Sequence, residues 1–109
     1  MGYTHYWTKS RNFTDKEWLD IMKGAANILS TAINSYLIPL AYEYDKPTEK
    51  PLVSTKVIRF NGVGDEGHET FYFDICTNDF EFCKTNRNDY DAPVAAILMY
   101  VKHRVPEFS

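Results

Sequence analysis

The chain has 109 residues, of which 44% are hydrophobic and 25% are charged, and its formal net charge is −3. This length and composition predict a single domain over residues 1–109 with one hydrophobic core, and they exclude a second domain. No apolar run approaches the ~20 residues of a membrane-spanning helix and no signal peptide opens the chain, so we expect a soluble cytoplasmic protein with no membrane partner.

Charge is distributed unevenly along the chain. Residues 65–91 carry eight acidic and two basic side chains, a balance of −6, whereas the remainder carries seven acidic and ten basic side chains. Binding to a nucleic-acid backbone requires a basic stripe, so general nucleic-acid binding is not expected. The stretch 65–91 predicts an acidic face, either a solvated loop region or a surface for a basic partner.

The first two predicted elements are a strand and a long helix. Alternating aromatic and threonine side chains predict a strand over residues 2–8. Thr14 and Glu17 have the spacing of a capping box, so a helix is expected to begin after Thr14. Apolar residues then keep helical spacing until Pro39, which is expected to stop the helix.

The middle of the chain predicts one long loop and three strands. Residues 41–51 contain two prolines and are typical of a loop. Strands are expected over residues 53–60, over 68–75 after a glycine-rich loop, and over 80–83. Three strands in succession favour an antiparallel meander.

A second helix is predicted from Asp91 to Pro106, and its apolar residues 92–101 are expected to be buried on most sides. Phe80 and Phe82 are expected to point inward from the last strand. The element order β-α-β-β-β-α predicts an α+β domain, with an antiparallel sheet of about four strands and both helices packed on one face.

Several familiar sites are absent from the sequence. His68-Glu69 lacks the second histidine of a zinc-protease helix, and no C-x-x-C pair is present. The glycine-rich loop is followed by a strand, so no helix N-terminus is available to bind a nucleotide phosphate. We therefore assign no cofactor and no metal site.

The glycine-rich loop from Asn61 to Glu69 is the most informative stretch. Its glycines could direct backbone N–H groups into one concavity that binds an anion, or they could serve only a flexible connection between strands. Polar side chains on either side of the loop, among aromatic ones, suit a small, flat and partly anionic ligand.

Six short motifs resemble those of a family of small uncharacterised proteins from phages, prophages and bacterial genomes. These are GYTHY (2–6), FTDKEW (13–18), RFNG (59–62), HETF (68–71), FCKT (82–85) and YD (90–91). The resemblance implies a bacterial host cell but no particular activity. This chain has Asn88-Asp89 where the family has Lys-Pro. Members often continue past the last helix, so a segment that completes the sheet or the site is expected to be missing here.

The polar residues of these motifs are expected at loop and strand ends, and a fold alone does not require them. We assign them to one ligand-binding site: Asn61, Gly62, His68, Glu69, Thr70, Tyr72, Cys83, Lys84, Thr85, Arg87, Tyr90 and Asp91.

The leading hypothesis is a non-enzymatic phage-type protein that sequesters a nucleotide-like signal of host defence. In it Lys84 and Arg87 face phosphate, and Tyr72 or Tyr90 stacks on a base. The alternative is a protein–protein inhibitor of a host defence complex, similar in role to an anti-CRISPR protein, that docks through the acidic face 65–91.

A third hypothesis is a small enzyme that uses His68 or the Cys83 thiol, whose pKa the neighbouring Lys84 would lower. The sequence shows no group that would orient such a pair, so no catalytic residue is assigned. The seventeen aromatic residues exceed what one small core readily covers, so a homo-oligomer is expected.

Overall fold

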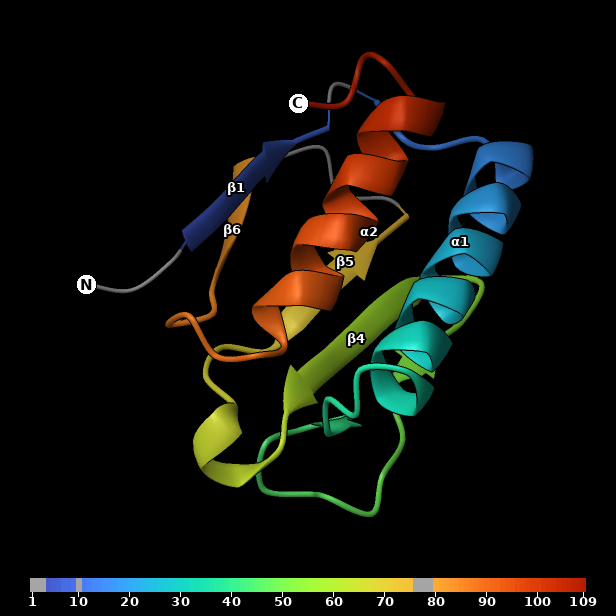
Figure 1. Cartoon of the computed structure of the whole chain (residues 1–109). Helices are drawn as coiled ribbons and strands as arrows, with labels where there is room; N and C mark the ends of the chain where they lie inside the picture. The colour runs from blue at the N-terminus through green and yellow to red at the C-terminus, as the bar shows by residue number, and fades with distance from the viewer. Residues whose placement is uncertain (1–3, 10, 76–79) are drawn as a thin grey trace.

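Two helices lie side by side over one face of a set of antiparallel strands (Figure 1). The computed structural model describes residues 4–9, 11–75 and 80–109. The elements are β1 (Thr4–Thr8), α1 (Asp15–Asn34), β2 (Leu40–Ala41), β3 (Leu52–Val53), β4 (Val57–Gly62), the 3-10 turn η1 (Gly64–Glu66), β5 (Phe71–Asp74), β6 (Phe80–Lys84) and α2 (Asp91–Arg104). The predicted α+β class is confirmed. Residues 2 and 3 of the first predicted strand lie outside the described residues.

Strand β4 is the centre of a four-stranded antiparallel sheet. It pairs with β5 from Val57 to Phe60, with β3 at Ile58 and Arg59, and with β2 at Asn61 and Gly62. The predicted strand 53–60 is therefore two strands. Between them, the Ser54 hydroxyl accepts a hydrogen bond from the Val57 amide and closes a tight turn.

The predicted three-strand meander is wrong in its last link. Strand β6 pairs with β1, not with β5, and the two form a separate antiparallel sheet. This sheet lies beside α2 in Figure 1. The pairing joins residues about 80 positions apart, as in Thr4 opposite Lys84, and local sequence patterns carry no information on such a partner.

Helix α1 begins as its capping box predicts. The Thr14 hydroxyl accepts from the Glu17 amide, and the Glu17 carboxylate accepts from the Thr14 amide. The helix ends at Asn34, before Pro39, because Leu37 adopts a left-handed backbone conformation with φ of 56°.

The core is an aromatic cluster beneath the helices. The Phe73 ring contacts the rings of Trp7, Trp18 and Phe71, with centroids about 6 Å apart. The prediction that Phe80 and Phe82 point into this core is wrong: they are 58% and 50% exposed. Trp7 faces the core and pairs with Glu81, so the Glu81 side chain lies on the same face. Successive side chains of a strand point to opposite faces, and Phe80 and Phe82, on either side of Glu81, therefore point outward.

Helix α2 is apolar on all sides but is buried on one side only. Val94, Ile97 and Val101 face the core, whereas Met99 is 72% exposed. The expectation that most sides of this helix are buried is therefore only partly met. No helix among the described residues is long and apolar enough to cross a membrane.

A buried ammonium group joins the two sheets. Lys9, 1% exposed, directly follows β1 and donates to the backbone carbonyl of Asp74 in β5, with Nζ–O 2.6 Å. Its Nζ also lies 3.6 Å from the Glu81 carboxylate in β6, and 5.0 Å from the centre of the Phe73 ring. Lys9 thus contacts two carboxyl-bearing residues from strands that do not pair with each other.

We expect Lys9→Met to lower the free energy of unfolding by about 3 kcal/mol, because it removes a buried ammonium group that lies beside the half-buried carboxylates of Asp74 and Glu81. Urea denaturation measures this. Lys16→Met, on the exposed side of α1, is the matched control and is expected to change stability by less than about 0.5 kcal/mol. Equal effects of the two changes would contradict the bridging role of Lys9.

Candidate functional site

Asn61 is fully buried and holds the glycine-rich loop together. Its Nδ2 donates to the His68 carbonyl and to the Thr70 hydroxyl, both at 3.0 Å. Its Oδ1 accepts from the amides of Gly62 and His68. All four bonds lie within the protein, so Asn61 positions the loop and has little capacity left for a ligand.

The backbone amides of this loop also bond within the protein. Gly64 donates to the Tyr44 carbonyl at 2.7 Å, Glu66 donates to Val63, and Gly67 donates to Gly64. With the amides of Gly62 and His68 directed to Asn61, these groups do not converge on an open concavity. The anion-binding arrangement that the glycines suggested is thus not formed by these amides.

Gly62 and Gly67 are needed because their backbones approach each other closely. A Cβ at Gly62 would lie 2.2 Å from the Glu66 carbonyl oxygen, and one at Gly67 would lie 2.6 Å from the Gly62 carbonyl oxygen. Gly62 is therefore a packing requirement of the loop.

Thr70 belongs to a polar cluster at the end of β4. Its hydroxyl donates to Glu43 Oε1 at 2.7 Å, and Arg59 Nη2 donates to the same oxygen at 2.6 Å. These bonds, the one from Arg59 above all, lower the pKa of Glu43. Tyr72, opposite Arg59 in the strand register, is exposed beside the cluster.

The second group of predicted residues centres on Tyr90, which is fully buried. Its hydroxyl donates to the Glu69 carbonyl at 2.6 Å and lies within hydrogen-bond distance of the Lys84 carbonyl, at 3.2 Å. The Lys84 amide in turn donates to the Glu69 carboxylate at 2.8 Å. Burial raises the pKa of the Tyr90 phenol, so the hydroxyl remains a donor. Tyr90 therefore joins the strands beside it and is not free to stack on a base.

Cys83 lies within this group and is also buried. Burial raises the pKa of its thiol to about 12, and the nearby carboxylates of Glu69 and Asp91 add to the shift. The Lys84 ammonium lies instead over the Phe82 ring, at 5.9 Å. Cys83 is accordingly a thiol at neutral pH, which makes it a poor nucleophile.

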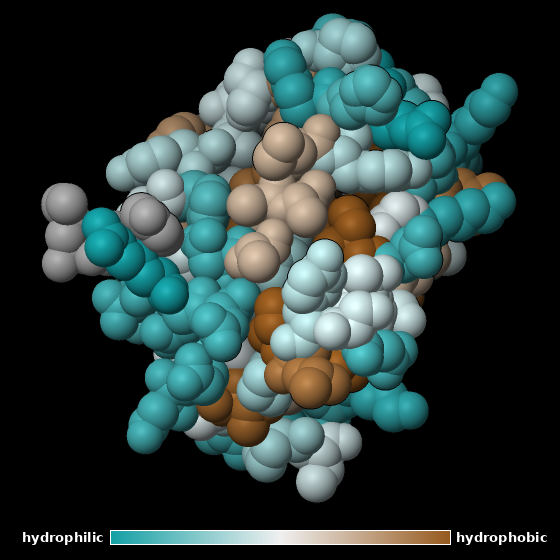
Figure 2. All heavy atoms as spheres, viewed as in Figure 1, coloured by the Kyte–Doolittle hydropathy of each residue, from teal (hydrophilic) through white to brown (hydrophobic). Residues whose placement is uncertain are grey.

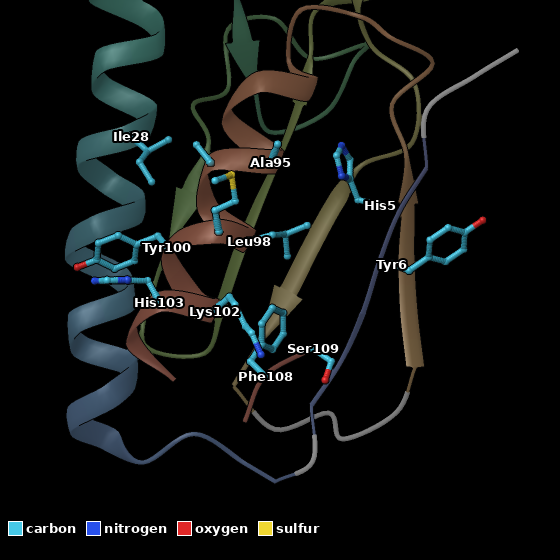
Figure 3. Close-up of a pocket in the computed structure, with 12 residues that line it drawn as sticks. His5, Tyr6, Ile28, Ala95, Leu98, Tyr100, Lys102, His103, Phe108 and Ser109 are labelled. Atoms are coloured by element: carbon cyan, nitrogen blue, oxygen red, sulfur yellow. The ribbon is translucent and has the colours of Figure 1, made fainter. Parts of the chain in front are cut away.

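Asp91 at the start of α2 binds two side chains. Its Oδ1 accepts from the buried Thr85 hydroxyl and lies 2.6 Å from His5 Nε2. His5 is not among the residues that the sequence predicts for the site. His5 lies two residues before the buried Trp7, so both side chains share one face of β1. This spacing could have indicated that the imidazole lies on the inner face of β1, toward α2 (Figure 3).

The predicted residues thus form two hydrogen-bonded groups, one around Asn61 and one around Tyr90. The Glu69 amide donates to the Lys84 carbonyl at 3.1 Å. Asn88 Nδ2, in the turn before α2, donates to the carbonyls of Gly67 and Asp65, at 3.0 and 3.4 Å. These bonds link the two groups. Arg87 is exposed in that turn, with φ of 63°.

Among the hollows that the described residues form, two have the largest volumes. One, of about 510 Å³, lies against the glycine-rich loop and is lined by Tyr44, Asp45, Gly64, Asp65, Gly67 and His68; we call it the loop hollow. The other is a groove of about 1000 Å³ between β1 and α2, with apolar walls that include Ala95, Leu98 and Phe108 (Figure 3).

Metal chemistry has no support in the part of the chain that the structure describes. No three His, Cys, Asp or Glu side chains within residues 4–9, 11–75 and 80–109 are grouped so that they could hold an ion. The acidic residues near the loop line a hollow, but they are not grouped closely enough to coordinate a metal ion.

Comparison of the chain with protein-family models, with curated proteins and with solved structures finds no match. A function is therefore inferred from the geometry of the loop hollow and the residues around it.

We expect Asn61→Ala to lower the free energy of unfolding by about 2–4 kcal/mol, since it leaves several buried donors and acceptors without partners. Denaturant titration measures the loss. Asn34→Ala, which removes an exposed amide on α1, is the control and is expected to stay within about 0.5 kcal/mol of the parent. A small effect at Asn61 would show that the loop does not depend on it.

We expect the Cys83 thiol to resist alkylation by iodoacetamide in the folded protein at pH 8, because it is buried and its pKa is about 12. The measurement uses a Cys76→Ser background and mass spectrometry. The same protein unfolded in guanidinium is the control and is expected to react fully. Rapid labelling of the folded protein would restore the thiol-enzyme hypothesis.

Proposed function

We propose that the chain is a non-enzymatic binding protein whose loop hollow accepts a basic side chain, most suitably arginine, from a partner protein. The observation that carries this proposal is the lining of the hollow. The carboxyl-bearing residues Asp45 and Asp65 and the ring of Tyr44 form its walls, and no lysine or arginine of the described residues is among them.

The chemistry of the hollow suits a guanidinium group. Carboxylates accept charge-assisted hydrogen bonds from its fork of N–H donors, and an aromatic ring can stack on its plane. Arg59 shows this combination elsewhere in the same molecule. It binds the Glu43 carboxylate and lies 4.3 Å from the centre of the Tyr42 ring. A partner arginine would find the same two kinds of group, Asp45 or Asp65 and Tyr44, in the loop hollow.

Rigidity of the loop supports a binding role. Asn61 holds the loop from beneath, the Gly64 amide ties it to Tyr44, and Asn88 ties it to the turn before α2. A surface that is already ordered loses less conformational entropy when a partner binds. The acidic residues are thus displayed on a preformed surface.

Sequestration of a nucleotide-like molecule remains a prediction, but the geometry favours it less. Most of the loop amides, those of Gly62, Gly64, Glu66, Gly67 and His68, bond within the protein. Neither Lys84 nor Arg87 lines the loop hollow. Two carboxylates in the walls would repel a phosphate group. The alternative hypothesis, docking of the acidic face on a protein, agrees better with these contacts.

The resemblance to phage and prophage proteins suggests where such a partner would be found. Complexes of host defence that bind nucleic acid carry exposed arginines on a basic surface, and an acidic protein can occupy that surface. We propose that the chain acts as an inhibitor of this type, with residues 65–91 as part of the docking face.

The test is an NMR titration of the protein with a short arginine-rich peptide at low salt. We expect shifts at Tyr44, Asp45 and Gly64 to His68. The double change Asp45→Asn and Asp65→Asn is expected to weaken binding at least about tenfold. Added salt is expected to weaken it as well.

The matched control removes one carboxylate elsewhere and is compared with the single changes Asp45→Asn and Asp65→Asn. Asp15→Asn, on an exposed position of α1, is expected to leave peptide binding unchanged. The same peptide with citrulline in place of arginine is expected not to bind. Shifts at the loop hollow with a nucleoside monophosphate, and none with the arginine peptide, would replace this proposal with the nucleotide hypothesis.

A further inference from the structure

The outward side of α2 is an apolar strip at the centre of one face of the molecule. Ala92, Ala95, Ala96 and Met99 lie at helical spacing on this side, and Met99 is 72% exposed. In Figure 2, tan to brown atoms cover the position that α2 has in the same view in Figure 1. A helix that is apolar on all sides is normally covered on all sides.

Hollows flank the strip on both sides. The 1000 Å³ groove separates α2 from β1, and a second hollow of about 360 Å³ separates it from α1 and is lined in part by Ile28, Tyr36 and Ala92. Both hollows include Ile28 and Ala96, so they form one continuous face. A stable dimer buries about 800 Å² on each partner, an eighth of the 6425 Å² surface of this chain.

The charges at the two ends of the strip are opposite in sign. Exposed Asp89 lies one turn before the strip begins, and exposed Lys102 and His103 lie one turn after Met99. The helix dipole has the opposite sense to these side chains, positive at the first end and negative at the last, and two antiparallel helices also bring dipole ends of opposite sign together. Such a strip is complementary to itself when two copies run in opposite directions.

We propose that this face is the contact between two copies of the chain, with their α2 helices antiparallel about a two-fold axis that passes between Ala95 and Ala96. This register places Met99 of each copy opposite Ala92 of the other, at the mouth of the 360 Å³ hollow. It places Lys102 of each copy opposite Asp89 of the other. The contact shares no residue with the lining of the loop hollow, so it is argued independently of that hollow, although Asp89 also belongs to the acidic stretch 65–91.

Lys102 can serve this contact without losing its present bond. Its Nζ donates to the Pro106 carbonyl at 2.7 Å, which uses one of three ammonium donors. Asp91, by contrast, is engaged by His5 and Thr85 within the chain, so Asp89 is the carboxylate that the partner meets.

The first test is sedimentation equilibrium of the whole chain. We expect a dimer, and we expect Met99→Lys to raise its dissociation constant at least about tenfold, because two ammonium groups would enter the apolar contact. The side chain of Met99 is exposed, so the variant is expected to fold. Phe82→Lys, which places the same charge on the exposed outer face of β6, is the matched control and is expected to remain dimeric.

Charge exchange tests the antiparallel register. Asp89→Lys alone and Lys102→Glu alone each bring like charges together at both ends of the contact, and each is expected to weaken the dimer. An equimolar mixture of the two variants is expected to form heterodimers with the affinity of the parent, because opposite charges meet again at both ends. Native mass spectrometry distinguishes the species.

Two results would overturn the proposal. One is a parent chain that remains monomeric well above micromolar concentration. The other is a dimer that survives Met99→Lys but dissociates with Phe82→Lys, which would place the contact on the outer aromatic face of β1 and β6. Failure of the mixed variants to associate would reject the antiparallel register.

Discussion

The fold depends on how the gap between β5 and β6 is closed. These strands belong to different sheets, and within the described residues no ladder of backbone hydrogen bonds joins them. Tyr90 bridges the gap at one end through the carbonyls of Glu69 and Lys84, and Lys9 bridges it at the other end through Asp74 and Glu81. Buried polar groups need partners, and the two bridges give hydrogen bonds to the carbonyls of Asp74 and Glu69.

This constraint explains why so many polar motif residues have structural partners. Cys83, Thr85 and Asp91 lie around the Tyr90 bridge, and Asn61 holds the loop that leads into β5. Polar residues at strand ends had suggested one ligand site, but hydrogen bonds within a fold require the same residue types. The exposed charged groups that line the loop hollow are acidic, and acidic groups repel a phosphate but attract a basic protein partner.

The sequence predicted correctly the features that depend on interactions between residues close together in the chain. The capping box at Thr14 and the extent of α2 both depend on neighbours within a few residues. The predictions from the sequence were wrong for features that depend on contacts between segments far apart in the chain. The partner of β6 is β1, and the register of that pair turned Phe80 and Phe82 outward. The burial of Lys9 could not be foreseen, because its carboxylates come from two strands far along the chain.

The two proposed surfaces meet at the turn before α2. Asn88 binds the carbonyl of Gly67 in the acidic loop, and its neighbour Asp89 stands at the end of the α2 strip. In the proposed dimer, Lys102 of the other copy would hold Asp89 and so restrain the turn that supports the loop hollow. The dimer would also present two such hollows, and a basic partner that spans both would bind with the added strength of a linked pair. Loss of the dimer would then weaken partner binding even though no residue of the hollow had changed.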